Sequence, residues 1–126
     1  MIFENPNSDV VLPKTDLTSV VLEHVDELGD KIALIDGTTG RKVSYKNLED
    51  QINHLAAGLN RIGFKKGDVC AVFCPNTPEY ATIFLAVAKV GGINTTVNSL
   101  YPKNDLIHQF NDSNSSSGFI FEISLL

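Results

Sequence analysis

The stretch DVCAVFCPNTPEYATIFLAVAKVGGINTTV, residues 68–97, decides the fold of this chain. It opens with the nearly continuous apolar run 69–74, which is typical of a strand covered on both faces in a parallel sheet. A helix with Pro78 in its first position follows, and Gly91 ends that helix before a second short strand at 93–97. Strand, helix and strand in this order predict a right-handed crossover between two parallel strands.

The same pattern continues downstream. Pro102 opens an amphipathic helix, and the apolar run 119–123 predicts a third strand in the same sheet. Two successive crossovers indicate an α/β sheet in which all three strands are parallel.

Upstream, the sequence predicts a helix and then a hairpin. Asp16 can cap a helix over 17–28, which Gly29 would end. Two β-rich runs, 32–35 and 41–45, surround a five-residue loop that contains glycine, as in a β-hairpin.

A further helix is expected between the hairpin and the first parallel strand. Ser44 can cap it and Gly63 would end it. Its apolar positions share one face: Leu48, Ile52, Leu55, Ala56, Leu59 and Ile62. The predicted fold class is therefore α/β, a parallel sheet with flanking helices, preceded by a helix and a β-hairpin, in one domain over residues 1–126.

The composition is that of a globular protein. Of the 126 residues 43% are hydrophobic and 20% are charged, and the net charge of −5 argues against a nucleic-acid partner. No apolar run approaches the roughly 20 residues that a transmembrane helix needs, and no secretory signal is expected at the N-terminus. Cys70 and Cys74 are expected to be buried thiols rather than a disulfide or a metal pair, as in an intracellular protein.

No constellation of chemical groups stands out. His24, His54 and His108 are expected in three separate helices, and no Ser-His-Asp or Cys-His arrangement can be argued. The sequence therefore predicts no catalytic residue, no cofactor-binding residue and no metal ligand in this chain.

Taken in order, these pieces resemble the N-terminal region of the adenylate-forming (AMP-dependent) synthetases, in particular the group of 4-coumarate–CoA ligase and firefly luciferase. The resemblance extends from about Leu17 to about Ser113. Each matching element is a cap or a turn, and their order and spacing carry the likeness. The elements are Ser44-Tyr45, Ala57-Gly58-Leu59, Lys66-Gly67-Asp68, Pro75 to Glu79, Gly91, and the loop from Val97 to Tyr101.

The resemblance implies an ATP-dependent acyl-CoA or aryl-CoA ligase of fatty acid or phenylpropanoid metabolism. Such enzymes join a carboxylate to AMP and then transfer the acyl group to coenzyme A. Their phosphate loop, adenine pocket, Mg²⁺ site and catalytic lysine would all lie beyond the matched segment. The chain is therefore expected to be an inactive N-terminal scaffold whose last residues, 114–126, diverge or are truncated. ATP, Mg²⁺ and CoA would serve only the complete enzyme, and the missing C-terminal part is the implied partner.

Residues 37–42, Gly-Thr-Thr-Gly-Arg-Lys, superficially resemble the phosphate loop of this family. They lie between two short β-runs and upstream of Ser44-Tyr45, whereas the family's loop comes after the region where this chain ends. We therefore expect a hairpin turn and not a nucleotide site at this place.

Two other functions stay open: a non-catalytic interaction protein and a small flavodoxin-like binding module. The resemblance favours a cytoplasmic location. The ending Ser124-Leu125-Leu126 is a weak match to a peroxisomal signal, because leucine replaces its basic residue. An uncovered edge of the sheet would also favour self-association.

Overall fold

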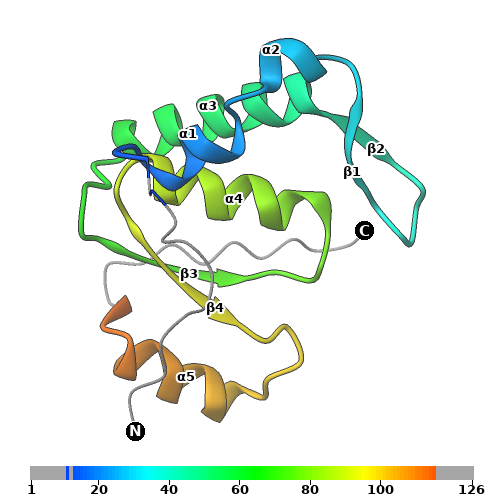
Figure 1. Cartoon of the computed structure of the whole chain (residues 1–126). Helices are drawn as coiled ribbons and strands as arrows, with labels where there is room; N and C mark the ends of the chain where they lie inside the picture. The colour runs from blue at the N-terminus through cyan, green and yellow to red at the C-terminus, as the bar shows by residue number, and fades with distance from the viewer. Residues whose placement is uncertain (1–10, 12, 116–126) are drawn as a thin grey trace, which may run out of the picture.

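The structure is a computed structural model and describes residue 11 and residues 13–115. The strands β3 (Val69–Phe73) and β4 (Ile93–Val97) are parallel, and their register runs from Val69 opposite Ile93 to Phe73 opposite Val97. Helix α4 (Pro78–Lys89) connects them and lies on one face of the pair, and α5 (Lys103–Asp112) lies on the other (Figure 1). The predicted strand–helix–strand crossover is confirmed.

The first turn of α4 begins without a side-chain cap. Thr77 occupies the N-cap position, but its side chain makes no capping hydrogen bond. Its hydroxyl oxygen instead lies 3.8 Å from the sulfur of Cys74, at the end of the preceding strand. Pro78 fits the first helical position because its missing N–H would have had no partner within the helix.

The core lies between β3 and the two long helices. Helix α3 (Tyr45–Arg61) packs on α4, and the hydroxyl of Ser44 accepts the expected capping bond from the N–H of Asn47. Four positions of its predicted apolar face are buried: Leu48, Ile52, Ala56 and Leu59. The predicted face extends too far at one position, because Ile62 lies beyond the last helical residue and is 59% exposed.

The helix predicted over residues 17–28 is divided into two short helices. The chain forms α1 (Leu17–Val21) and α2 (Val25–Leu28) where the sequence predicts one helix over 17–28. The cap by Asp16 is confirmed, since its carboxylate accepts the N–H of Ser19. The break arises because the two segments pack on different partners, α1 on α4 and α2 on α3. The buried residue of α1 is Thr18, a polar residue and not one of the apolar residues of the helix. Its hydroxyl donates a hydrogen bond to the backbone oxygen of Leu85.

The hairpin is confirmed as a separate two-stranded antiparallel sheet of β1 (Ile32–Ile35) and β2 (Lys42–Ser44). Its second strand is one residue shorter at each end than predicted. The predicted third parallel strand, 119–123, lies outside the described residues.

Candidate functional site

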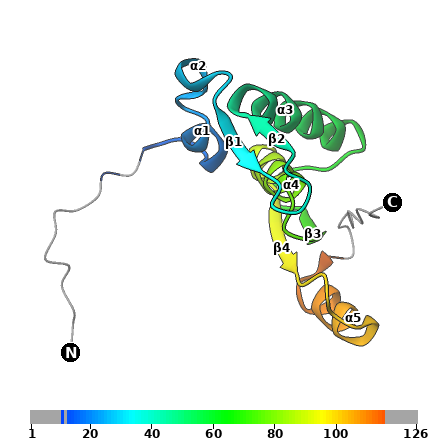
Figure 2. The same ribbon diagram turned by 90° about the vertical axis from the view of Figure 1, so that its right-hand side faces the viewer.

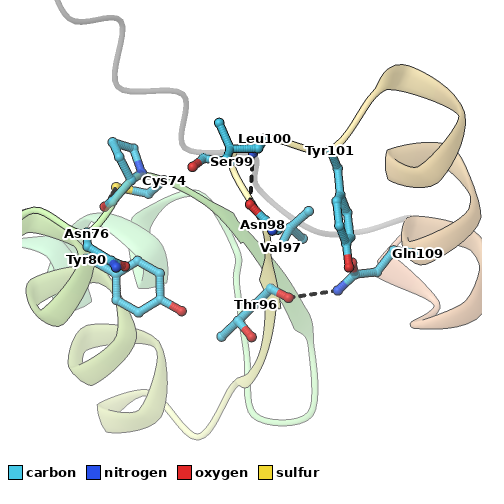
Figure 3. A pocket seen from close by; sticks show the side chains of 11 residues that line it. Cys74, Asn76, Tyr80, Thr96, Val97, Asn98, Ser99, Leu100, Tyr101 and Gln109 are labelled. Carbon is cyan, nitrogen blue, oxygen red and sulfur yellow. Dashed lines mark hydrogen bonds between the residues drawn. The ribbon is translucent and has the colours of Figure 1, made fainter.

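A pocket of about 590 Å³ opens at the carboxyl ends of β3 and β4. Ligands of open α/β sheets bind at such an edge, because the loops that leave parallel strands gather there. Figure 3 shows the pocket, and its described lining residues are Cys74, Pro75, Asn76, Tyr80, Thr96, Val97, Asn98, Ser99, Leu100, Tyr101 and Gln109.

Three elements position these side chains. Strand β3 ends at Phe73, and α4 begins five residues later at Pro78 and brings Tyr80 to one side of the pocket. After β4, the side-chain oxygen of Asn98 accepts the N–H of Leu100 at 2.9 Å, which shapes the loop that leads to Tyr101. Tyr80 and Tyr101 lie on opposite sides of the pocket in Figure 3.

The wall on the α5 side is held by one amide. Gln109 donates its side-chain N–H to the backbone oxygen of Thr96 at 2.8 Å (Figure 3). None of the residues of α5 is buried. Because little apolar packing supports this helix, the Gln109 bond is a main attachment of α5 to β4.

The lining is polar but uncharged. The described lining residues offer carboxamides, hydroxyls, one thiol and backbone groups, and none of them is Asp, Glu, Lys, Arg or His. Burial raises the pKa of the Cys74 thiol, and the nearby charge of Glu79 adds to the effect. A thiol with a raised pKa is a poor nucleophile at neutral pH, so the pocket suits hydrogen bonding and not acid–base or nucleophilic chemistry.

An ion pair joins the hairpin to this edge of the sheet. The guanidinium of Arg41, at the end of the hairpin turn, bonds the carboxylate of Glu79 in the first turn of α4. Partial burial raises the pKa of Glu79, but the hydrogen bonds from Arg41, from its own backbone and from Thr77, together with the charge of Arg41, outweigh this effect, and the net shift is downward. A second pocket of about 230 Å³ shares Asn76 and Tyr80 with the first.

The stretch 37–42 is the hairpin turn that the sequence predicts. The carboxylate of Asp36 accepts the N–H groups of Thr38 at 2.8 Å and of Thr39 at 3.1 Å, and these bonds lower its pKa. Gly40 has a φ of 73°, a conformation that glycine adopts without strain. A phosphate loop works through backbone N–H groups turned toward the ligand. Here two of those groups are already bonded to the chain's own carboxylate.

The histidines are not brought together. His24 is exposed and pairs with Glu23, and a ring nitrogen of His54 lies 2.7 Å from the backbone oxygen of Asp50. Among the described residues, no group of three His, Cys, Asp or Glu side chains is close enough to hold a metal ion. Cys70 and Cys74 are both buried as thiols, as expected.

This pocket was not among the features predicted from the sequence. A signal was present, because Asn76 and Asn98 each follow a predicted parallel strand and the carboxyl ends of such strands share one edge. Tyr80, Tyr101 and Gln109 carried no comparable signal, since their arrival at the same place depends on how α4 and α5 pack.

Comparison with known proteins decides the family. Residues 21–123 match the family described as AMP-binding enzyme. The chain belongs to this family. Probable 4-coumarate–CoA ligase 1 of Dictyostelium discoideum is 35% identical over 106 residues, which cover 84% of this chain and 19% of the relative. 4-coumarate–CoA ligase 4 of Arabidopsis thaliana is 35% identical over 113 residues, which cover 86% of this chain and 20% of the relative. The chain thus spans about a fifth of the length of these curated relatives.

Solved structures agree on the fold. The N-terminal subdomain of Klebsiella oxytoca NpsA, in complex with anthranilyl-AMSN, superposes with a TM-score of 0.74 at 28% identity, covering 79% of this chain and 26% of that one. A benzoate CoA ligase from Burkholderia xenovorans LB400 gives a TM-score of 0.75 at 19% identity, covering 80% and 20%. This AMP-binding family member therefore has the fold found in the N-terminal subdomain of adenylating enzymes. None of the helices in its described part is long and apolar enough to cross a bilayer.

Proposed function

We propose that this chain is the N-terminal scaffold of an ATP-dependent acyl-CoA or aryl-CoA ligase and contributes no catalytic group to the reaction. The observation that carries the proposal is the match of residues 21–123 to the AMP-binding enzyme family. The resemblance to the CoA ligases of this family implies a complete enzyme that adenylates a carboxylate with ATP and then forms a thioester with CoA. Two relatives that this chain matches over about a fifth of their length are 4-coumarate–CoA ligases. Their names favour a planar aromatic acid as the substrate of the complete enzyme.

The chemistry of the described residues supports a scaffold. Transfer of an adenylyl group needs cationic groups or a metal ion around the phosphates, because negative charge develops there in the transition state. The described lining of the main pocket carries no charged side chain, and the N–H groups of Thr38 and Thr39 are used within the hairpin turn. ATP, Mg²⁺ and CoA would therefore be held by the rest of the enzyme.

The first test uses the full chain alone. Incubated with ATP, Mg²⁺ and a panel of aliphatic and aromatic carboxylates, it should release no pyrophosphate above a protein-free blank. Pyrophosphate release that Lys42→Ala abolishes would contradict the proposal and place nucleotide chemistry in the hairpin turn.

The second test is a chimera. The region of Arabidopsis 4-coumarate–CoA ligase 4 that this chain matches is replaced by the matching residues of this chain, and CoA-ester formation from 4-coumarate is measured. The chimera should be active, whereas the same relative with the region deleted should be inactive. A chimera as inactive as the deletion would show that this chain does not perform the scaffold role.

The second candidate function is an independent small-molecule binding module. The pocket at the carboxyl ends of β3 and β4 is the observation that supports it. Such a module would bind its ligand without any further polypeptide. It is favoured over the scaffold only if the chain alone binds a small molecule at this pocket and the chimera is inactive.

A further inference from the structure

An apolar groove lies beside the polar pocket, between the hairpin and the start of α4. We call it the Ile35 groove. Its described lining comprises Leu34, Ile35, Asn76, Thr77, Pro78, Tyr80 and Ala81. Of these residues Leu34 and Tyr80 pack against the core, whereas Ile35 is 62% exposed. An exposed isoleucine beside a hollow lined mainly by apolar side chains is a place where burial would be favourable.

The groove is held in shape from both sides. The Arg41–Glu79 ion pair ties the end of the hairpin turn to the first turn of α4, and Pro78 fixes the backbone where that helix begins. A preformed groove loses little conformational entropy when another segment enters it.

The groove is continuous with the candidate site. It shares Asn76 and Tyr80 with the polar pocket. Figure 2, which turns the right-hand side of Figure 1 toward the viewer, shows the hairpin, the start of α4 and the carboxyl ends of β3 and β4 on that same side. Polar pocket and apolar groove therefore form one hollowed face.

Resting on the proposed function, we propose that the Ile35 groove receives an uncharged apolar side chain from the downstream part of the ligase. In the relatives about four fifths of the length lies outside the matched region, so a large body of polypeptide is there to pack on this scaffold. That body approaches from the carboxyl ends of the strands, since the nucleotide and substrate sites of open α/β sheets are built there. The described lining of the groove has no charged residue, which excludes a buried acid or base as its occupant.

The experiment compares two exposed isoleucines in the chimera. Ile35→Asp places a charge in the groove, and Ile62→Asp is the matched control, because Ile62 is 59% exposed and lies at the far end of α3. The readout is the temperature at which half of the CoA-ligase activity is lost. Ile35→Asp should lower it by about 1–3 °C, as expected when a protein of this size loses the burial of one large aliphatic side chain, and Ile62→Asp should leave it unchanged.

The outcomes separate this inference from the proposed function. An inactive parent chimera would refute the proposed function before any variant is measured. An active parent in which both variants behave alike would overturn the inference and leave the proposed function standing.

The full chain alone supplies two further checks. Ile35→Asp should not shift its unfolding midpoint, because Ile35 is exposed there; a shift equal to that of the chimera would mean that Ile35 acts in the chain's own packing. A dimer of the chain that Ile35→Asp dissociates would make a second copy the occupant. Either result would overturn the inference.

Discussion

Replacing Gly92 by alanine tests how tightly α4 and β4 are joined. A β-carbon built at this position would lie 2.5 and 2.8 Å from two ring carbons of Phe64 and 2.9 Å from a methyl carbon of Val87. Phe64 is 3% exposed and Val87 is fully buried, so neither side chain can turn toward solvent without losing its burial. The φ of Gly92 is not in the left-handed region, and the expected effect is therefore purely steric.

The magnitude follows from the cost of overpacking. Inserting a methyl group into a well-packed core destabilises a protein by about 1–3 kcal/mol, a large part of a total stability of about 5–15 kcal/mol. Gly58→Ala is the control, and it is expected to raise the stability instead of lowering it. Its added β-carbon in α3 would meet nothing within 4 Å, and alanine is the better helix former by about 0.5–1 kcal/mol.

Urea unfolding followed by far-ultraviolet circular dichroism measures both changes, at low micromolar protein so that self-association is minimal. We expect Gly92→Ala to unfold at a lower urea concentration than the parent and Gly58→Ala at a higher one. A Gly92→Ala variant as stable as the parent would refute the steric argument. A loss of stability in Gly58→Ala equal to that in Gly92→Ala would also refute it, because the added methyl group would then destabilise the fold without any contact with Phe64.

Three further predictions concern acid stability, helix α5 and the sheet edge. Hydrogen bonds from Ser19 lower the pKa of Asp16, and the hydrogen bond from Arg41 is among the causes that lower the pKa of Glu79. Both carboxylates therefore stabilise the fold when the pH is above their ordinary pKa values of 3.8 and 4.5. That stabilisation should be lost as the pH falls from about 4.5 through the lowered folded-state values, and Asp16→Asn should weaken the pH dependence of the urea midpoint in this range. Gln109→Ala should speed amide exchange throughout α5 and leave exchange in α3 unchanged; unchanged exchange in α5 would contradict the role of the Gln109 amide. The full chain should elute from size exclusion as a species larger than a monomer at high concentration, because an uncovered sheet edge promotes association; a single monomer peak at all concentrations would contradict this.

The strand–helix–strand unit was predictable because its signals are local. The apolar run 69–74, Pro78 and Gly91 each act on the backbone within a few residues, through side-chain periodicity, a fixed φ and a permitted positive φ. Gly91 does adopt a φ of 76° at the end of α4. The cap by Ser44 is equally local, and both it and the parallel pairing of β3 with β4 are confirmed.

The break between α1 and α2 was not predictable from the same rules. The apolar spacing over 17–28 fits one helix, but the two halves pack on different helices that are distant in the sequence. The buried hydroxyl of Thr18 bonds a backbone oxygen 67 positions away. No local pattern announces such a contact, because a threonine hydroxyl is satisfied equally well by water until α4 lies against it.

Gly91 and Gly92 show most plainly which features depend on the local sequence and which depend on the tertiary structure. The sequence by itself determined that a helix ends there, since a positive φ is a property of one residue and its neighbours. Only the tertiary structure decided that the second glycine is needed for space, because Phe64 reaches it from a loop far back in the chain. The candidate site belongs to the same class: Asn76 and Asn98 are marked by the strands that they follow, but Tyr80 and Gln109 join them only after α4 and α5 have packed on opposite faces of the sheet.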